Sequence, residues 1–65
     1  MCEFKVYLEE PGKNRMEVAR NVIMAKKKDG NILLVNGLGA VTLVNGASIE
    51  EVDTFSQKMI LRRES

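Results

Sequence analysis

Cys2 is the residue of this chain whose type and position could support the most distinctive chemistry. It is the only cysteine, and it stands one residue after the start of the sequence. A thiolate beside a chain terminus can bind a metal ion together with the terminal amine or with neighbouring backbone amide nitrogens, such as those of Cys2 and Glu3. The alternative interpretation is a small buried hydrophobic residue at the start of a strand, because free cysteine often packs in this way.

A metal site built on Cys2 needs a second chain. One chain offers a single sulfur and a few backbone nitrogens, which are too few donors for a closed site. Two chains related by a twofold axis would supply two sulfurs and two or more nitrogens, a donor set that suits square-planar Ni(II) or Cu(II). The sequence therefore allows a metal centre at Cys2 and Glu3 that is shared within a homodimer.

Lys26, Lys27 and Lys28, together with Tyr7 on the polar side of the first strand, are the residues most suited to bind nucleic acid. Small β-barrels bind single-stranded RNA through basic grooves and aromatic side chains. The formal net charge is only +1, and this balance argues against a broad basic surface. The same lysines are typical of a solvated turn that protects a strand edge. RNA binding is therefore the alternative function.

Side chains for enzymatic catalysis are scarce. The sequence has no histidine, which is the most common general base and metal ligand. The acidic residues Glu50, Glu51 and Asp53 are more typical of a solvated edge than of an acid–base pair. The segment Gly37-Leu38-Gly39 does not complete the dinucleotide-binding glycine pattern, because Thr42 stands where that pattern needs its third glycine. We expect a protein that is not an enzyme.

The length of 65 residues predicts one small β domain, residues 1–65, with a thin core. A domain of this size buries only about 60% of the surface that its unfolded chain exposes, so it usually needs a disulfide, a metal or a partner subunit. A single cysteine excludes an internal disulfide, and we therefore expect a homodimer. No apolar run is long enough to span a bilayer, and the N-terminus lacks the pattern of a secretory signal. We expect a cytoplasmic chain with a reduced thiol and no membrane contact.

Two apolar runs, each closed by Asn-Gly, form the centre of the sequence. Ile32 to Val35 is apolar at every position, which predicts a strand covered on both faces, and Val41 to Val44 alternates between the two faces. Asn36-Gly37 and Asn45-Gly46 follow these runs, and Asp29-Gly30 precedes the first of them. Each pair predicts a hairpin turn, because Asn, Asp and Gly tolerate positive φ.

The segment before this centre is open to two interpretations. Cys2 to Leu8 alternates between apolar and polar residues and predicts a half-buried strand. Arg15 to Lys28, and most of all Arg15 to Ala25, fits either a helix that begins after Asn14 or two short strands with a break at Arg20-Asn21. We favour the strands, because a lone helix would have little sheet to cover. The inward side chains would then be those of Met16, Val18, Val22 and Met24.

The last part of the chain returns to the core in short pieces. Ser48 to Glu51 could start a single helical turn, and Val52 and Phe55 are expected in the core. Met59 to Leu61 predicts a last short strand, and Arg62 to Ser65 a frayed tail. These elements together predict an all-β fold: a small SH3- or Sm-like barrel, or a strongly bent antiparallel sheet of five to six short strands.

Several short motifs spread along the chain add up to a family resemblance. They are Met1-Cys2-Glu3, the strand from Phe4 to Leu8, the glycine-punctuated middle from Ile32 to Ile49, and the ending Ile49-x-x-Val52-Asp53 with Lys58-Met59-Ile60-Leu61. In these motifs the sequence resembles the CooT family of small nickel-binding proteins, which are accessory to carbon monoxide dehydrogenase maturation. The family is also catalogued as predicted RNA-binding proteins.

The resemblance implies a small β-barrel-like fold and a homodimer. It implies one Ni(II) per dimer, held between the two chains by Cys2 near each N-terminus. The function that it implies is that of a nickel chaperone or sensor for metalloenzyme maturation, whose partner would be a nickel-enzyme maturation factor.

Overall fold

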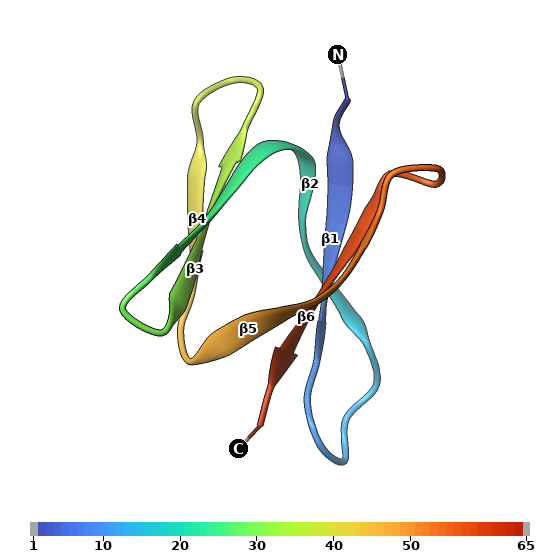
Figure 1. Ribbon diagram of the computed structural model, residues 1–65, viewed down its shortest axis with the longest axis vertical. Coiled ribbons are helices and arrows are strands. Elements are labelled where there is room, and N and C mark those ends of the chain that lie inside the picture. The colour runs from blue at the N-terminus through green and yellow to red at the C-terminus, as the bar shows by residue number, and fades with distance from the viewer. Residues whose placement is uncertain (1, 65) are drawn as a thin grey trace.

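The computed structural model describes residues 2–64 of the chain, and these residues form strands and turns without a helix (Figure 1). The strands are β1 (Phe4–Glu9), β2 (Met16–Lys28), β3 (Asn31–Asn36), β4 (Val41–Val44), β5 (Ala47–Asp53) and β6 (Lys58–Arg63). They form one sheet in the order β4-β3-β2-β1-β6-β5. The sheet curls so strongly that it makes a half-barrel, with β4 and β5 as its two unpaired edges (Figure 1).

The pairing of β1 with β6 is parallel, whereas the other neighbouring strands pair antiparallel. The prediction of an all-β fold with a strongly bent sheet is confirmed, and the sheet is mixed rather than purely antiparallel. After β4, at one edge of the sheet, the chain continues as β5, which contacts β3 and forms the opposite edge. It then forms β6, which lies beside β1 and runs parallel to it. This crossing brings residues from the two ends of the chain onto neighbouring strands.

The core lies on the concave side of the sheet, where alternate residues of the strands meet. In β1 the predicted alternation is confirmed, since Val6 and Leu8 are buried and Phe4 packs against the core. The run in β3 is covered on one face only, because Ile32 and Leu34 are buried while Leu33 and Val35 are half-buried. The fully buried large side chains are those of Ile32, Leu34, Leu61, Val6 and Val22.

β2 is one strand of 13 residues, so both the helix and the two separate strands are wrong for this segment. The break expected at Arg20-Asn21 is a bend within the strand, where Asn21 has a positive φ of 56°. The pairing of β2 with β3 shifts register between Val22 and Met24, as a β-bulge does. Of the four side chains expected inward, Val22 is buried and Val18 packs against the core. Met24, beside the shift, and Met16, at the start of the strand, are instead exposed by 45% and 54%.

Two of the three predicted hairpins form, but only one has the expected turn, because in the turn from β3 to β4 the positive φ belongs to Gly39 and not to Asn36 or Gly37. Asp29 and Gly30, with φ of 53° and 79°, join β2 to β3 in the conformation that suits a two-residue hairpin. Asn36 begins the turn from β3 to β4, where its Oδ1 accepts hydrogen bonds from the backbone N–H groups of Leu38 and Ala40. Asn45-Gly46 is not a hairpin turn, because β4 and β5 do not pair; it makes a corner between the two halves of the sheet.

The expectations for the last part of the chain need three corrections. Ser48 to Glu51 belongs to β5 rather than to a helical turn, because β5 pairs with β6 around a bulge. Val52 and Phe55 are exposed, by 51% and 99%, since β5 is an edge strand and Phe55 lies in the turn that follows it. The last strand extends through Arg62 and Arg63, where a frayed tail was expected.

Candidate metal centre

Cys2 is exposed and stands two residues before the start of β1, at one end of the half-barrel (Figure 1). The interpretation of Cys2 as a core residue is therefore wrong for this chain. The side chains of Phe4, Val6 and Leu8, which share its parity in the sequence, do lie in or against the core. An exposed thiol next to the start of a strand is accessible to a metal ion and to a second chain. Met1, whose amine was considered as a further ligand, lies outside the described residues.

The carboxylate of Glu3 is held by β2 and lies beside the turn from β3 to β4. Asn21 Nδ2 donates a hydrogen bond of 2.8 Å to Glu3 Oε1. The backbone carbonyl of Asn21 accepts a hydrogen bond of 3.0 Å from the N–H of Gly37. A Cβ atom at Gly37 would stand 3.6 Å from Glu3 Oε2, so this glycine lies close beside the carboxylate. These contacts fix the chain directly after Cys2.

Asn21 is the residue that sequence reasoning missed at this site. Its positive φ is a conformation that asparagine adopts more readily than most residues. This conformation lies in the bend of β2, from which the side chain reaches Glu3, 18 positions away in the sequence. Its one sequence signal is an asparagine within a run that otherwise favours strands, which predicts a break in the strand and not a contact with Glu3.

The described part of the chain does not assemble a metal site from side chains alone. Among residues 2–64, no three His, Cys, Asp or Glu side chains are grouped closely enough to hold a metal ion. The Cys2 thiol of one chain would therefore need backbone nitrogens, or the donors of a second chain, to complete a coordination sphere.

The end of the molecule that carries Cys2 also presents exposed hydrophobic side chains. The turn from β3 to β4 and the turn from β5 to β6 both lie toward this end (Figure 1). Their outermost apolar residues, Leu38 and Phe55, are 96% and 99% exposed. A hollow of about 320 Å³ lies beside Leu38, and its lining includes Glu3 and Asn21. Leu38 and Phe55 lie on separate turns, and each leaves a large apolar side chain almost fully in water.

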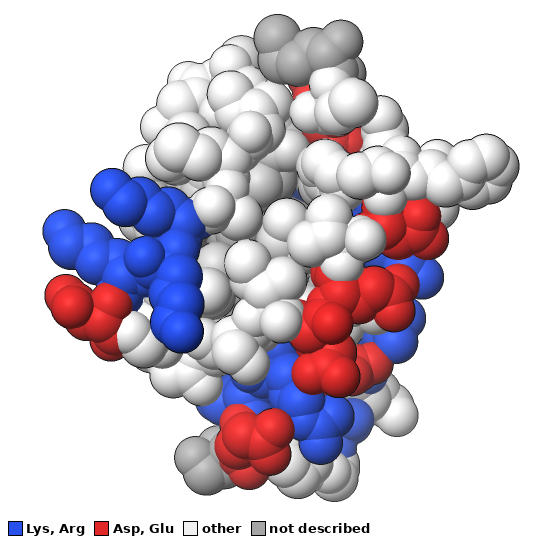
Figure 2. All heavy atoms as spheres, in the orientation of Figure 1, with Lys and Arg blue, Asp and Glu red and all other residues white. Residues whose placement is uncertain are grey.

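The residues of the RNA alternative occupy separate regions. Lys26, Lys27 and Lys28 are exposed at the end of β2 that leads into β3, and a basic group appears on this flank in Figure 2. Tyr7 pairs with Glu17, nine residues earlier in β2 than Lys26. Acidic side chains gather on the opposite flank in this view. RNA binding stays a prediction, and the structure does not bring its four residues together.

The fold and the lone cysteine define a small all-β protein that exposes a single thiol at its N-terminal end. The sequence model of the family described as CO dehydrogenase accessory protein CooT matches residues 1–62. The match spans nearly the whole chain, and the chain belongs to the CooT family.

A solved structure has the same fold. It is the crystal structure of a CooT candidate from Carboxydothermus hydrogenoformans, which superposes with a TM-score of 0.83 at 22% sequence identity. The match covers 98% of this chain and 100% of the other. No curated protein sequence matches the chain. Among residues 2–64, no helix has the length and hydropathy needed to cross a membrane.

Proposed function

We propose that this protein is a nickel-binding homodimer that serves the maturation of a nickel enzyme, as a chaperone or sensor rather than as a catalyst. Ni(II) is its cargo, one ion for each pair of chains. The thiolates of the two Cys2 residues bind the ion together with backbone nitrogens of Cys2 or Glu3. The protein acts in the cytoplasm, where the thiol stays reduced, and its partner is a maturation factor or the nickel enzyme itself.

The observation that carries this proposal is the exposed Cys2 of a chain that belongs to a family of CO dehydrogenase accessory proteins. Thiolate sulfur and amide nitrogen in a planar arrangement suit Ni(II). The hydrogen bonds that hold Glu3 support the backbone donors, because a fixed segment after Cys2 loses less conformational freedom when it binds the metal.

A second copy is the occupant that we assign to the surface around Leu38 and Phe55. This surface lies at the same end as Cys2, so a chain that covers it by a twofold axis brings the two thiols toward one another. Burial of the two side chains would remove from water the most exposed large hydrophobic groups among the described residues. The dimer and the metal centre would then depend on the same interface.

Replacing Cys2 tests the proposal at its centre. Cys2→Ser keeps the size of the side chain and removes the thiolate, so we expect tight Ni(II) binding to be lost while the circular dichroism spectrum stays that of the wild type. Isothermal titration of reduced protein with NiCl2 measures the loss. Retention of wild-type affinity by the Cys2→Ser variant would sink the proposal.

The dimer surface has a matched control on the edge strand β4. Leu43 is exposed by 53% on the edge strand β4, so Leu43→Ser removes a similar apolar side chain from a different surface. We expect the double variant Leu38→Ser, Phe55→Ser to be monomeric in analytical ultracentrifugation and to bind Ni(II) weakly, and Leu43→Ser to stay dimeric. The reverse pattern would move the interface to β4 and leave the role of Cys2 standing.

A further inference from the structure

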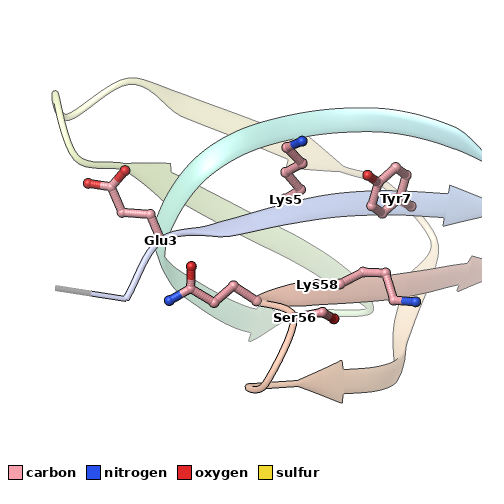
Figure 3. Close-up of a pocket in the computed structure, with 6 residues that line it drawn as sticks. Glu3, Lys5, Tyr7, Ser56 and Lys58 are labelled. Atoms are coloured by element: carbon pink, nitrogen blue, oxygen red, sulfur yellow. The ribbon is translucent and has the colours of Figure 1, made fainter.

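A second hollow, of about 330 Å³, lies on the convex side of the sheet between β1 and the start of β6. Lys5 and Tyr7 of β1 line it from one side, and Lys58 of β6 lines it from the other (Figure 3). The remaining lining comes from Glu3 and from the turn before β6, through Ser56 and Gln57. A volume of this order is at the lower end of the range for small-molecule sites.

Two lysines face this hollow from directly opposite positions. Lys5 and Lys58 are register partners in the parallel pairing of β1 with β6. Like charges at opposed positions on neighbouring strands repel one another and destabilise a sheet. Within residues 2–64, neither lysine forms an ion pair with a carboxylate. Each ammonium group is close enough to one carboxylate to contribute to its lowered pKa, Lys5 to that of Glu17 and Lys58 to that of Asp53, but neither is in direct contact with it.

The carboxylates near the two lysines are each hydrogen-bonded to another group. Glu3 accepts from Asn21 at 2.8 Å. Glu17, whose pKa is lowered mainly by Arg20 and to a smaller extent by Lys5, accepts two hydrogen bonds from the Arg20 guanidinium.

The third of these carboxylates is Asp53, the register partner of Lys58. It accepts hydrogen bonds from the Ser56 hydroxyl and from two backbone N–H groups of the turn before β6. Like Glu17, and like Glu3, which itself lines the hollow, Asp53 is hydrogen-bonded to another group. Among residues 2–64 none of the three makes a direct ion pair with Lys5 or Lys58, so both ammonium groups stay available to a ligand.

The turn before β6 holds a polar side chain at the edge of the hollow in an uncommon conformation. Gln57 has a positive φ of 57°, which few residues other than Gly, Asn and Asp adopt. Its backbone carbonyl accepts a hydrogen bond of 3.0 Å from the N–H of Lys5, so the turn is tied to β1. Backbone strain of this kind is frequent at ligand-binding sites. Figure 3 shows the turn beside Lys58 and Glu3, with Lys5 and Tyr7 across from it.

We propose that this hollow binds a small oxyanion that carries two or more negative charges, of the phosphate or polycarboxylate class. The ammonium groups of Lys5 and Lys58 would neutralise the charge. The Tyr7 hydroxyl and the Gln57 amide would donate neutral hydrogen bonds. This site is separate from the proposed nickel function, because none of these side chains is a metal ligand there.

The test is a titration of the ¹⁵N-labelled protein at constant ionic strength, followed by amide chemical shifts. The probes are inorganic phosphate, pyrophosphate and citrate, with acetate as a singly charged control. We expect at least one multivalent anion to shift the amides of Lys5, Tyr7, Gln57 and Lys58 in a saturable way. The anion with the highest affinity assigns the class to phosphate or to polycarboxylate.

Charge-removing variants locate the binding. Lys5→Gln and Lys58→Gln should each weaken binding about tenfold or more, because each removes one charge-assisted hydrogen bond. Lys27→Gln removes the same charge from the end of β2 and should leave the affinity unchanged. Tyr7→Phe should weaken binding less than either lysine variant does. Because it keeps the aromatic ring, this variant also tests the site if a lysine variant does not fold.

Three results would overturn this site. The first is that no multivalent anion binds in a saturable way. The second is that Lys27→Gln weakens anion binding as much as Lys58→Gln does. The third is that acetate binds with the same affinity as pyrophosphate. The Cys2→Ser variant should bind the anion as the wild type does, and Lys58→Gln should bind Ni(II) as the wild type does. Failure of one site can therefore be told apart from failure of the other.

Discussion

Replacement of Asn21 by alanine and by glycine would separate two roles that this residue combines. Its side chain donates to Glu3, and its backbone adopts a φ of 56° in the bend of β2. Asn21→Ala removes the hydrogen bond and places a residue that disfavours positive φ in the bend. Asn21→Gly removes the same hydrogen bond but adopts this φ without steric cost. The difference between the two variants therefore measures the backbone contribution alone.

The magnitudes follow from the exposure of the contact and from the backbone conformation. The hydrogen bond joins two exposed residues, so its loss should cost about 0.5–1 kcal/mol of the free energy of unfolding. The left-handed conformation should cost alanine about a further 1 kcal/mol. We expect Asn21→Gly to be destabilised by about 0.5–1 kcal/mol and Asn21→Ala by about 2 kcal/mol. A domain of this length has a total stability of only about 3–10 kcal/mol, so both changes are measurable.

Urea unfolding at one fixed protein concentration measures these differences, because the stability of a dimer depends on concentration. Both variants should also bind Ni(II) more weakly than the wild type, since Glu3 and the segment after Cys2 are no longer held. An Asn21→Gly variant less stable than Asn21→Ala would refute the backbone argument. Wild-type Ni(II) affinity in both variants would refute the role of Asn21 in positioning the site.

Other substitutions test the core, the turn before β6 and the corner between β4 and β5. Leu61→Ala removes a fully buried side chain and should cost about 2–5 kcal/mol in urea unfolding, with Leu43→Ala on the edge strand β4 as a partly exposed control that costs less. The pKa of Asp53 lies below its ordinary value of 3.8, mainly because the Ser56 hydroxyl donates a hydrogen bond to it. This contact therefore stabilises the fold above that pH, and the stabilisation is lost as the pH falls through the lowered pKa. The difference in urea midpoint between wild type and Ser56→Ala should therefore be largest near neutral pH and vanish in strong acid; a difference that grows in acid would contradict the assignment. Gly46→Ala should cost about 1 kcal/mol because the φ of Gly46 is 61°, whereas Gly37→Ala, at a position without positive φ, should cost less.

The elements set by neighbouring residues were predictable from the sequence. Val6 and Leu8 alternate with polar residues, and this period of two is sufficient to predict a half-buried strand. Asp29-Gly30 fixes its hairpin because both residues accept positive φ, whatever lies elsewhere in the chain. Cys2 was singled out by its type and by its place beside the N-terminus, and the structure shows that it is exposed.

The features that depend on distant residues were not predictable in this way. Asn45-Gly46 has the same chemistry as a hairpin turn, but β5 leaves β4 for the other side of the sheet, and no local signal records that choice. For the same reason Phe55 was expected in the core. The contact of Asn21 with Glu3 and the opposition of Lys5 to Lys58 arise from the bend of β2 and the parallel entry of β6. Contacts of this kind depend on how the whole chain folds, so they cannot be predicted from the residues next to them in the sequence.

The measurement that tests the nickel-bridged dimer most directly is native mass spectrometry of reduced protein titrated with Ni(II), together with its absorbance spectrum. We expect one Ni(II) for each pair of chains and a thiolate-to-metal charge-transfer band, both of which should be absent in Cys2→Ser. One Ni(II) bound to a single chain, or binding by the dimer without a band that depends on Cys2, would contradict a metal centre shared between two N-terminal thiolates.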